Sequence, residues 1–248
     1  MNSFFRNIPP VTKNLLIINV IVWLICALMP SFGHTLDRVC ALHYFISPDF
    51  RFWQPITYMF MHAGFTHIFF NMFGVVMFGA TIERVFGSAR YLLFYLTVGV
   101  GAALIQEGVY AIWISNLAKG LPDGLTLSAV AEEGARLVSQ GMNWVQEPLA
   151  SLNLAINTPT VGASGALYGV LLAFAMIFPN MPLYFFFIPV PVKAKWMVLG
   201  YGILELFYGI TGLQSGVAHF AHLGGMIVAL LLIIYWRKKG EINRGPLY

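Results

Sequence analysis

A serine and a histidine in two separate apolar segments are the residues of this chain best suited to chemistry. Ser164 lies in the sequence Gly-Ala-Ser-Gly at residues 162–165, and His222 lies in Ala-His-Leu-Gly-Gly at residues 221–225. A serine hydroxyl is a poor nucleophile until a neighbouring base, most often histidine, takes its proton. An ionisable side chain inside a membrane segment is costly and generally has a function. Together the two residues indicate a serine hydrolase whose active site lies within a bilayer.

Two polar residues of another apolar segment can complete such a site. His67 and Asn71 are four positions apart, so they share one face of a helix. Their side chains and the backbone N–H of Ser164 are the donors that an oxyanion intermediate requires. Tyr168 follows Ser164 by one turn and is expected to stack on the ring of His222.

The composition indicates an all-α integral membrane protein. The chain has 248 residues, of which 58% are hydrophobic and 10% charged, whereas soluble domains carry about 25% charged residues. The mean hydropathy is +0.75. The net charge of +4 is dispersed in short clusters, not in the basic stripe that nucleic-acid binding requires. Cys26 and Cys40 are too few to hold a fold together.

We expect a single domain over residues 1–248 with six membrane-spanning helices. Each span needs about 20 apolar residues. The expected spans are 13–30, 65–82, 90–112, 161–178, 194–212 and 217–236, separated by long outer loops at 31–64 and 113–159. The first apolar segment has no A-x-A cleavage site and is interpreted as an anchor. A short helix is expected around 126–140, and Pro189 and Pro191 mark a short loop before the fifth span.

The positions of the basic residues predict the orientation of the chain. Positive residues concentrate on the cytoplasmic side of membrane proteins. If both termini are cytoplasmic, ten basic residues lie inside and four outside. The inner set is Arg6, Lys13, Arg84, Arg90, Lys193, Lys195, Arg237, Lys238, Lys239 and Arg244, and the outer set is Arg38, Arg51, Lys119 and Arg136.

This orientation brings four polar residues to one depth. The second, fourth and sixth spans all run inward, so His67, Asn71, Ser164 and His222 lie near their outer ends, where water can reach them. Each residue alone has a simpler interpretation, because small residues at four-residue spacing often form packing faces, and polar residues often form hydrogen bonds between helices. Gly165 belongs to such a packing pair. Their shared depth favours the catalytic interpretation.

No aspartate lies in any expected span, so a Ser-His-Asp triad is not predicted. The expected machinery is a dyad of Ser164 and His222, with the orientation of the histidine set by packing. Glu205 lies inside the fifth span, where an unpaired charge is expensive, and is expected to be protonated and hydrogen-bonded. His219 lies one turn before His222 and is an alternative base.

An ordered series of motifs resembles the rhomboid family of intramembrane serine proteases. The motifs are Trp53-Gln54, His67-x-x-x-Asn71, Glu83-Arg84 with Gly87, residues 162–165 with Tyr168, and residues 221–225, and together they cover about residues 50 to 236. The resemblance implies a six-helix core with Ser164 as the nucleophile and His222 as the base. It also implies an oxyanion hole formed by His67, Asn71 and the Ser164 amide, with Gly162, Gly165 and Gly225 in supporting positions.

The resemblance implies an endopeptidase that cuts transmembrane segments of other membrane proteins, with no metal or organic cofactor. It implies substrates with helix-destabilising residues and a small side chain before the cut, and it offers Glu205 a second role at the gate through which substrate enters. Many bacterial members have Trp-Arg where this chain has Trp53-Gln54, which puts the anchoring of the first outer loop in doubt. Ala229 replaces a packing glycine of the family, and no role is implied for residues 113–159.

Two other functions remain open at this point. A non-catalytic rhomboid-like protein would bind transmembrane clients without cutting them, and a small transporter or channel would line a pathway with polar groups across the whole bilayer. Retention of both Ser164 and His222 argues against the first, and the clustering of polar residues at one depth argues against the second. The expected location is a bacterial cytoplasmic membrane, with the site near the outer face, because no organelle-targeting presequence is visible.

Overall fold

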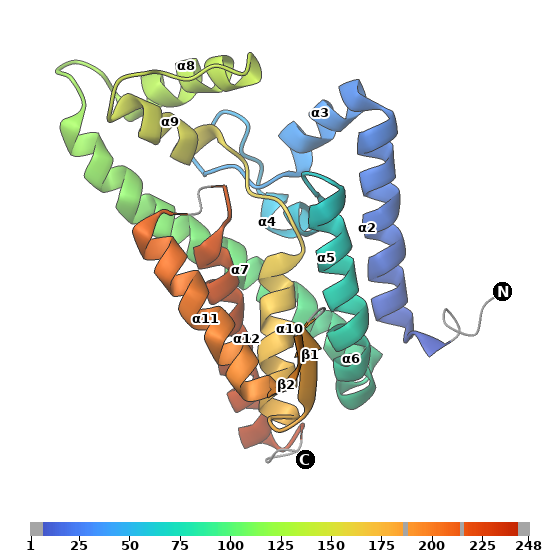
Figure 1. The fold of residues 1–248 in the computed structure, drawn as a ribbon. Coiled ribbons are helices and arrows are strands. Elements are labelled where there is room, and N and C mark those ends of the chain that lie inside the picture. Colours follow the sequence, from blue (N-terminus) through green and yellow to red (C-terminus); the bar gives the residue numbers. More distant parts are fainter. Residues whose placement is uncertain (1–6, 186–187, 214–215, 243–248) are drawn as a thin grey trace.

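The protein is a bundle of long helices that run alternately in opposite directions (Figure 1). The computed structural model describes residues 7–185, 188–213 and 216–242, so Arg6 and Arg244 of the charge argument lie outside the described residues. The long helices are α2 (Pro10–Leu28), α5 (Phe65–Gly74), α7 (Ser88–Leu117), α10 (Ser164–Ile177), α11 (Ala194–Thr211) and α12 (His219–Lys239). A π-helical turn (Val75–Gly79) joins α5 to α6 (Ala80–Phe86) without a break.

These helices overlap the six expected spans. Among the described residues, four helical segments are long and apolar enough to cross a membrane, namely Pro10–Leu28, Phe65–Phe86, Ser88–Gly120 and His219–Lys239, and Ser164–Ile177 is a shorter apolar helix. The chain is therefore an all-α, multi-pass integral membrane protein. The assignment of six spans to one domain stays a prediction. Helix α7 continues five residues beyond the expected end of its span.

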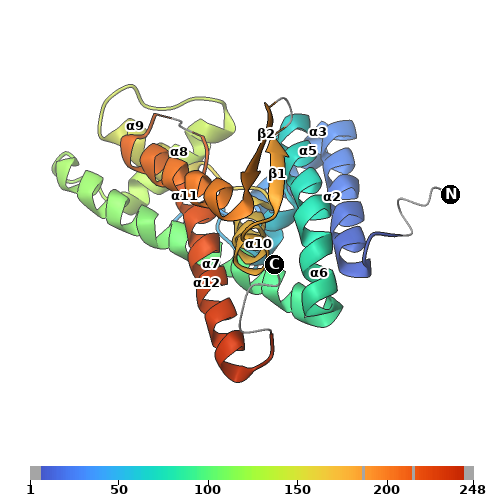
Figure 2. The ribbon, with the colours of Figure 1, turned by 60° about the horizontal axis from the view of Figure 1, so that its bottom comes forward.

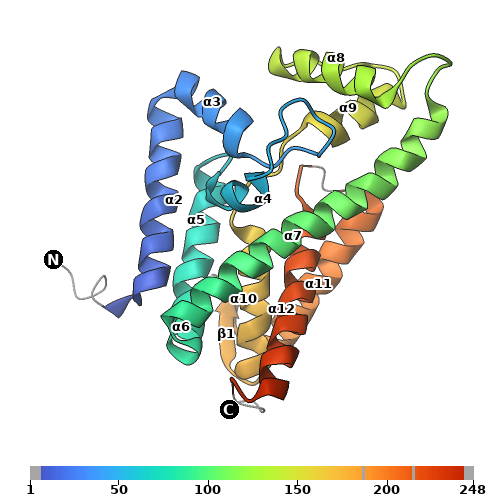
Figure 3. The same ribbon diagram turned by 180° about the vertical axis from the view of Figure 1, so that it is seen from behind.

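Helix α10 lies at the centre of the bundle and packs against α7 and α12, which also contact each other (Figure 3). Glycines let α10 and α12 touch along their backbones. A Cβ atom added to Gly225 would lie 1.9 Å from the carbonyl oxygen of Gly165, and one added to Gly169 would lie 2.9 Å from that of Gly225. Close approach through small residues drives helix association in lipid, where no hydrophobic effect operates between helices. The expected packing role of Gly165 is present and places Ser164 beside α12.

The first outer loop contains helices that the sequence did not predict. They are α3 (Pro30–Cys40), α4 (Gln54–Thr57) and a 3₁₀ turn (Tyr58–Phe60). The side chain of Gln54 is fully buried and holds this region together. Its oxygen accepts from the N–H of His43 at 3.1 Å, and its amide nitrogen donates to the carbonyl oxygens of Asp49 and Arg38 at 2.9 and 3.2 Å. The doubt about loop anchoring was wrong, because a neutral amide can satisfy several backbone groups at once.

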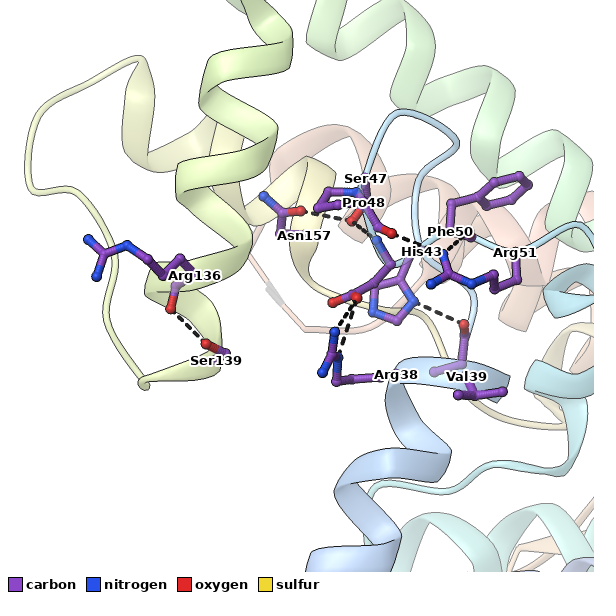
Figure 4. Close-up of polar contacts among 12 residues, drawn as sticks. Arg38, Val39, His43, Ser47, Pro48, Phe50, Arg51, Arg136, Ser139 and Asn157 are labelled. Atoms are coloured by element: carbon purple, nitrogen blue, oxygen red, sulfur yellow. Dashed lines mark hydrogen bonds and ion pairs between the residues drawn. The ribbon is translucent and has the colours of Figure 1, made fainter.

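The second outer loop folds into two helices that cover one end of the bundle (Figure 1). The predicted helix near 126–140 is confirmed as α8 (Leu127–Ser139), and α9 (Leu149–Asn157) was not predicted. Thr126 caps α8 by accepting from the N–H of Ala129. Asn157 of α9 accepts a hydrogen bond from Ser47 at 2.8 Å, which ties the two outer loops together (Figure 4).

A buried carboxylate and a short strand hairpin lie at the opposite end of the bundle. Glu83 accepts hydrogen bonds from the backbone N–H groups of Val11 and Thr12 at 2.9 and 2.7 Å, so it satisfies unpaired donors at the start of α2. A hairpin of β1 (Pro182–Phe185) and β2 (Ile188–Lys193) precedes α11 (Figure 2). The expectation of a simple short loop here was wrong, since β1 and β2 pair as antiparallel strands.

Candidate functional site

Ser164 is the first residue of α10, so it lies at the helix end and not one turn inside it. Residues 160–163 lead into the helix, and residues of the first outer loop hold this segment in place. Thr160 and Leu42 exchange backbone hydrogen bonds of 2.7 and 2.9 Å, and the N–H of Gly162 donates to the carbonyl oxygen of Tyr58 at 2.9 Å. The first N–H groups of a helix have no partner within the helix. The backbone N–H of Ser164 is thereby available to a ligand.

His222 contacts Ser164 directly. Its Nε2 atom lies 2.7 Å from the Ser164 hydroxyl oxygen, within hydrogen-bonding distance. His222 lies in the first turn of α12 and is buried. The ring of Tyr168 stacks on the imidazole with centroids 4.2 Å apart and planes 4° apart, as predicted. Ser164 and His222 are 58 positions apart in the chain, and the backbone contact between α10 and α12 brings them together.

A buried carboxylate stands behind His222. Glu205 of α11 places its Oε2 atom 2.6 Å from Nδ1 of His219 and 3.0 Å from Nδ1 of His222. The second of these contacts does not meet the geometry of a hydrogen bond, although the two atoms are close enough for a charge interaction. The other oxygen, Oε1, accepts a hydrogen bond from the Tyr168 hydroxyl. Packing alone was expected to orient His222, but the structure also places the carboxylate of a glutamate from another helix beside its ring.

The same cluster bears on two other expectations. His219 points its Nδ1 atom at Glu205, and it is His222 that reaches the serine, so the structure does not favour His219 as the base. Ligand atoms of Glu205, His219 and His222 lie within 4.8 Å of one another, a spacing that suits a metal ion. Their mutual contacts already account for this clustering.

Of the two side chains predicted as oxyanion donors, the structure places His67 near Ser164 and shows no direct contact for Asn71 among the described residues. Gly162 has a φ of +124°, and a Cβ added there would lie 2.7 Å from Nε2 of His67 and 3.6 Å from the Ser164 hydroxyl oxygen. The His67 ring therefore borders the segment that leads to Ser164. Asn71 follows one turn later on α5 and is buried. Among the residues that the structure describes, no hydrogen bond joins Asn71 to Ser164 or His222, and its role stays a prediction.

One histidine near the site was missed by the sequence argument. His62 lies in the turn before α5, with its ring edge-on to that of His67 and the centroids 5.0 Å apart. Both of its ring nitrogens are buried without a hydrogen-bond partner in the described part of the chain. Burial, with a smaller effect from His67, lowers the pKa of His62 to about 4. Its spacing of five from His67 matches no helical face, so the pattern gave no signal.

Comparisons with known proteins agree with this architecture. Residues 49–239 match the family model described as Rhomboid domain. The chain is 33% identical over 178 residues to RHOMBOID-like protein 12, mitochondrial, of Arabidopsis thaliana, and the match covers 71% of the chain and 44% of that relative. It is 29% identical over 177 residues to Rhomboid-like protein 16, chloroplastic, of the same plant, covering 71% and 46%. It is 27% identical over 189 residues to Rhomboid protease AarA of Providencia stuartii, covering 73% and 55%. The matches span about half the length of these relatives.

Proposed function

Because this chain belongs to the rhomboid family, we propose that it is an intramembrane serine endopeptidase that uses Ser164 as nucleophile and His222 as base. The observation that carries this proposal is the 2.7 Å contact between the Ser164 hydroxyl oxygen and Nε2 of His222. A nucleophile within hydrogen-bonding reach of its base is the arrangement that acyl transfer requires. The relative from Providencia stuartii is itself named a protease, which supports the same reaction class.

The reaction proceeds in two halves through an acyl-enzyme. Nε2 of His222 takes the hydroxyl proton as the Ser164 oxygen bonds to the carbonyl carbon of the substrate. The resulting imidazolium gives that proton to the leaving amine as the C–N bond breaks. Water then attacks the ester while His222 takes one of its protons, and the same proton returns to the serine oxygen as the acid product leaves. No cofactor takes part in these steps.

The negative oxygen of each tetrahedral intermediate needs hydrogen-bond donors. The Ser164 backbone N–H at the start of α10 suits this role, and the dipole of the helix favours negative charge at the same point. We assign the side chains of His67 and Asn71 as the other donors, since both lie on α5 and the His67 ring borders the segment that leads to Ser164. Loss of one such donor typically costs about 10²–10³-fold in kcat.

The substrates in this proposal are transmembrane segments of other membrane proteins. Peptide bonds in a helix are shielded by their own hydrogen bonds, so a substrate must unwind locally before its carbonyl reaches Ser164. We propose that the protein lies in a bacterial cytoplasmic membrane, with both termini on the cytoplasmic side and the site near the outer face. The distribution of basic residues supports this orientation. Relatives named as mitochondrial and chloroplastic make the choice of membrane a point to test by cell fractionation.

Cleavage of a labelled transmembrane substrate by purified protein in detergent tests the proposal. Ser164→Ala and His222→Ala should abolish cleavage, while the matched controls Ser139→Ala and His34→Ala, at exposed positions of α8 and α3, should keep the wild-type rate. A fluorophosphonate probe should label wild-type protein but not Ser164→Ala. Cleavage that persists in Ser164→Ala would refute the assignment.

The same assay distinguishes the non-catalytic alternative. A protein that only binds transmembrane clients would retain the labelled substrate in a pull-down and produce no fragments at any enzyme concentration. The direct contact between Ser164 and His222 favours the protease, because client binding alone gives no reason for a serine hydroxyl to face an imidazole nitrogen.

A further inference from the structure

We propose that Glu205 is a positioning residue that holds His222 in place and stabilises its positive charge. The site then works as a triad of Ser164, His222 and Glu205 and not as an isolated dyad. This inference rests on the proposed function. It starts from the three groups that the Glu205 carboxylate contacts, which come from two different helices, α10 and α12.

The carboxylate acts on the imidazole from two sides. Oε2 lies 3.0 Å from Nδ1 of His222, on the opposite side of the ring from the atom that contacts Ser164. Oε1 accepts from the hydroxyl of Tyr168, whose ring stacks on the imidazole 4.2 Å away. One side chain thus touches the edge of the ring and anchors the residue that covers its face. Movement of Glu205 would release both contacts.

The neighbours of Glu205 suit an ionised carboxylate. A carboxylate only accepts hydrogen bonds, and Tyr168, His219 and His222 can each donate one. Glu205 is 8% exposed, and an isolated charge so deeply buried would be very costly without such donors. The three contacts therefore explain how a charge is kept at this depth, and they replace the expectation of a protonated side chain.

This geometry has two consequences for catalysis. When Nδ1 of His222 carries a hydrogen that faces Oε2, the Nε2 atom keeps its lone pair toward the Ser164 hydroxyl, which is the tautomer that a base requires. When His222 becomes an imidazolium, the carboxylate charge at 3.0 Å stabilises it. The Nδ1 proton stays on His222 throughout, Nε2 takes and gives up the proton of the serine hydroxyl, and Glu205 takes no proton itself.

Glu205→Gln tests the proposal because it removes the charge and keeps the shape. We expect kcat to fall by about 10²-fold, within the usual range for acid–base assistance, with KM changed by less than about twofold. The matched control is Thr211→Val on the same helix, where an exposed hydroxyl donates to the backbone carbonyl of Phe207. It should keep the wild-type kcat. Unchanged kcat in Glu205→Gln would overturn the proposal.

A second substitution separates positioning from a purely structural role. The rate at which a fluorophosphonate probe labels Ser164 is measured in wild type, Glu205→Gln, His222→Ala and the double variant. If Glu205 acts through His222, Glu205→Gln should slow labelling of wild type but change that of His222→Ala by less than about twofold. If Glu205→Gln lowers the labelling rate equally in wild type and in His222→Ala, Glu205 only supports the fold and the proposed triad is refuted.

The pH profile gives an independent readout. His222 is faced by Ser164 and Tyr168 of α10, Glu205 of α11 and His219 of its own helix, and His67 of α5 lies near the same serine. Of these groups Glu205 is the one carboxylate. Its removal should move the acid limb of kcat/KM to lower pH by about one unit, because the protonated form of His222 loses a partner. An acid limb that stays in place would contradict the electrostatic part of the proposal.

A shorter acid keeps the test decisive if Glu205→Gln does not fold. Glu205→Asp retains the charge but withdraws the carboxylate by about 1.5 Å, the length of one C–C bond. We expect kcat to fall at least about tenfold while the acid limb stays within about half a unit. An Asp variant with full kcat would refute the need for contact. If the wild-type protein does not cleave the substrate, the proposed function is refuted. If Glu205→Gln is fully active, only the role of Glu205 is refuted.

Discussion

Gly225→Ala should separate the two proposed catalytic residues, Ser164 and His222, without altering either of them. A Cβ at this position would lie 1.9 Å from the carbonyl oxygen of Gly165, which is a backbone atom and cannot rotate away. Restoring an ordinary carbon–oxygen contact of about 3.3 Å requires α10 and α12 to move apart by about 1.4 Å. Gly165 directly follows Ser164, and Gly225 is one turn from His222. The movement therefore occurs at the site itself.

The effect of Gly225→Ala on catalysis follows from the longer distance between Ser164 and His222. An added 1.4 Å would take the contact between Ser164 and His222 from 2.7 Å to about 4 Å, beyond hydrogen-bonding range. A misplacement of about 1 Å can cost about 10²-fold in rate, so we expect kcat/KM to fall by at least that factor. The control is Gly108→Ala in α7, where an added Cβ meets no atom of the described residues within 4 Å.

The assay is cleavage of a fluorogenic transmembrane peptide in detergent, with thermal unfolding measured on the same samples. Gly108→Ala should keep the wild-type rate, because it makes the same chemical change in open space. If Gly225→Ala cleaves at a rate within about twofold of wild type, the close contact of α10 and α12 does not set the distance between Ser164 and His222.

Three further predictions concern the surroundings of the site. Gln54→Ala should lower the free energy of unfolding by about 2–3 kcal/mol in thermal or denaturant unfolding, because the buried N–H of His43 and several carbonyl groups lose their partner; an unchanged transition would contradict the anchoring role. Gly162→Ala should reduce kcat at least about tenfold, since a φ of +124° is strained for alanine and the new Cβ lies 2.7 Å from Nε2 of His67, whereas full activity would show that this segment adjusts freely. With the pKa of His62 at about 4 in the folded protein, the unfolded chain binds the extra proton below pH 6.5, so stability should fall by about 3 kcal/mol as the pH drops from about 6.5 to about 4. His62→Phe should flatten this dependence in pH-dependent unfolding, and an identical slope in the variant would disprove the assignment.

Several features of the site were predictable because they depend on local pattern. The spacing of four between His67 and Asn71 fixes a common helix face, and Tyr168 one turn after Ser164 predicted the stacked ring that the structure contains. The short helix near residues 126–140 was predicted from helix-start signals at Ser128, Glu132 and Glu133, although the residue that caps it is Thr126. By contrast, α9 and the hairpin before α11 carry no strong pattern of their own.

The partner of His222 could not be predicted, because it depends on the rotation of one helix against another. Glu205 is 17 positions from His222 and lies on a different helix, and nothing in the order of residues states which face of α11 turns toward α12. In a soluble protein the apolar face of a helix marks the side that is buried. In lipid both sides of a helix can be apolar, so hydrophobic pattern says little about which side faces protein.

The membrane class of this chain, the order of its motifs and the candidate pair of Ser164 and His222 can all be read from the order of its residues. These follow from hydrophobic length, from residue types and from the bias of basic residues, which are all local or additive properties. The tertiary structure alone decided that Ser164 begins its helix, that glycines bring α10 onto α12, and that Glu205 stands behind His222. Those features are distances of a few ångströms between helices remote in sequence, and they are set by backbone packing and side-chain contacts that form only when the whole bundle assembles.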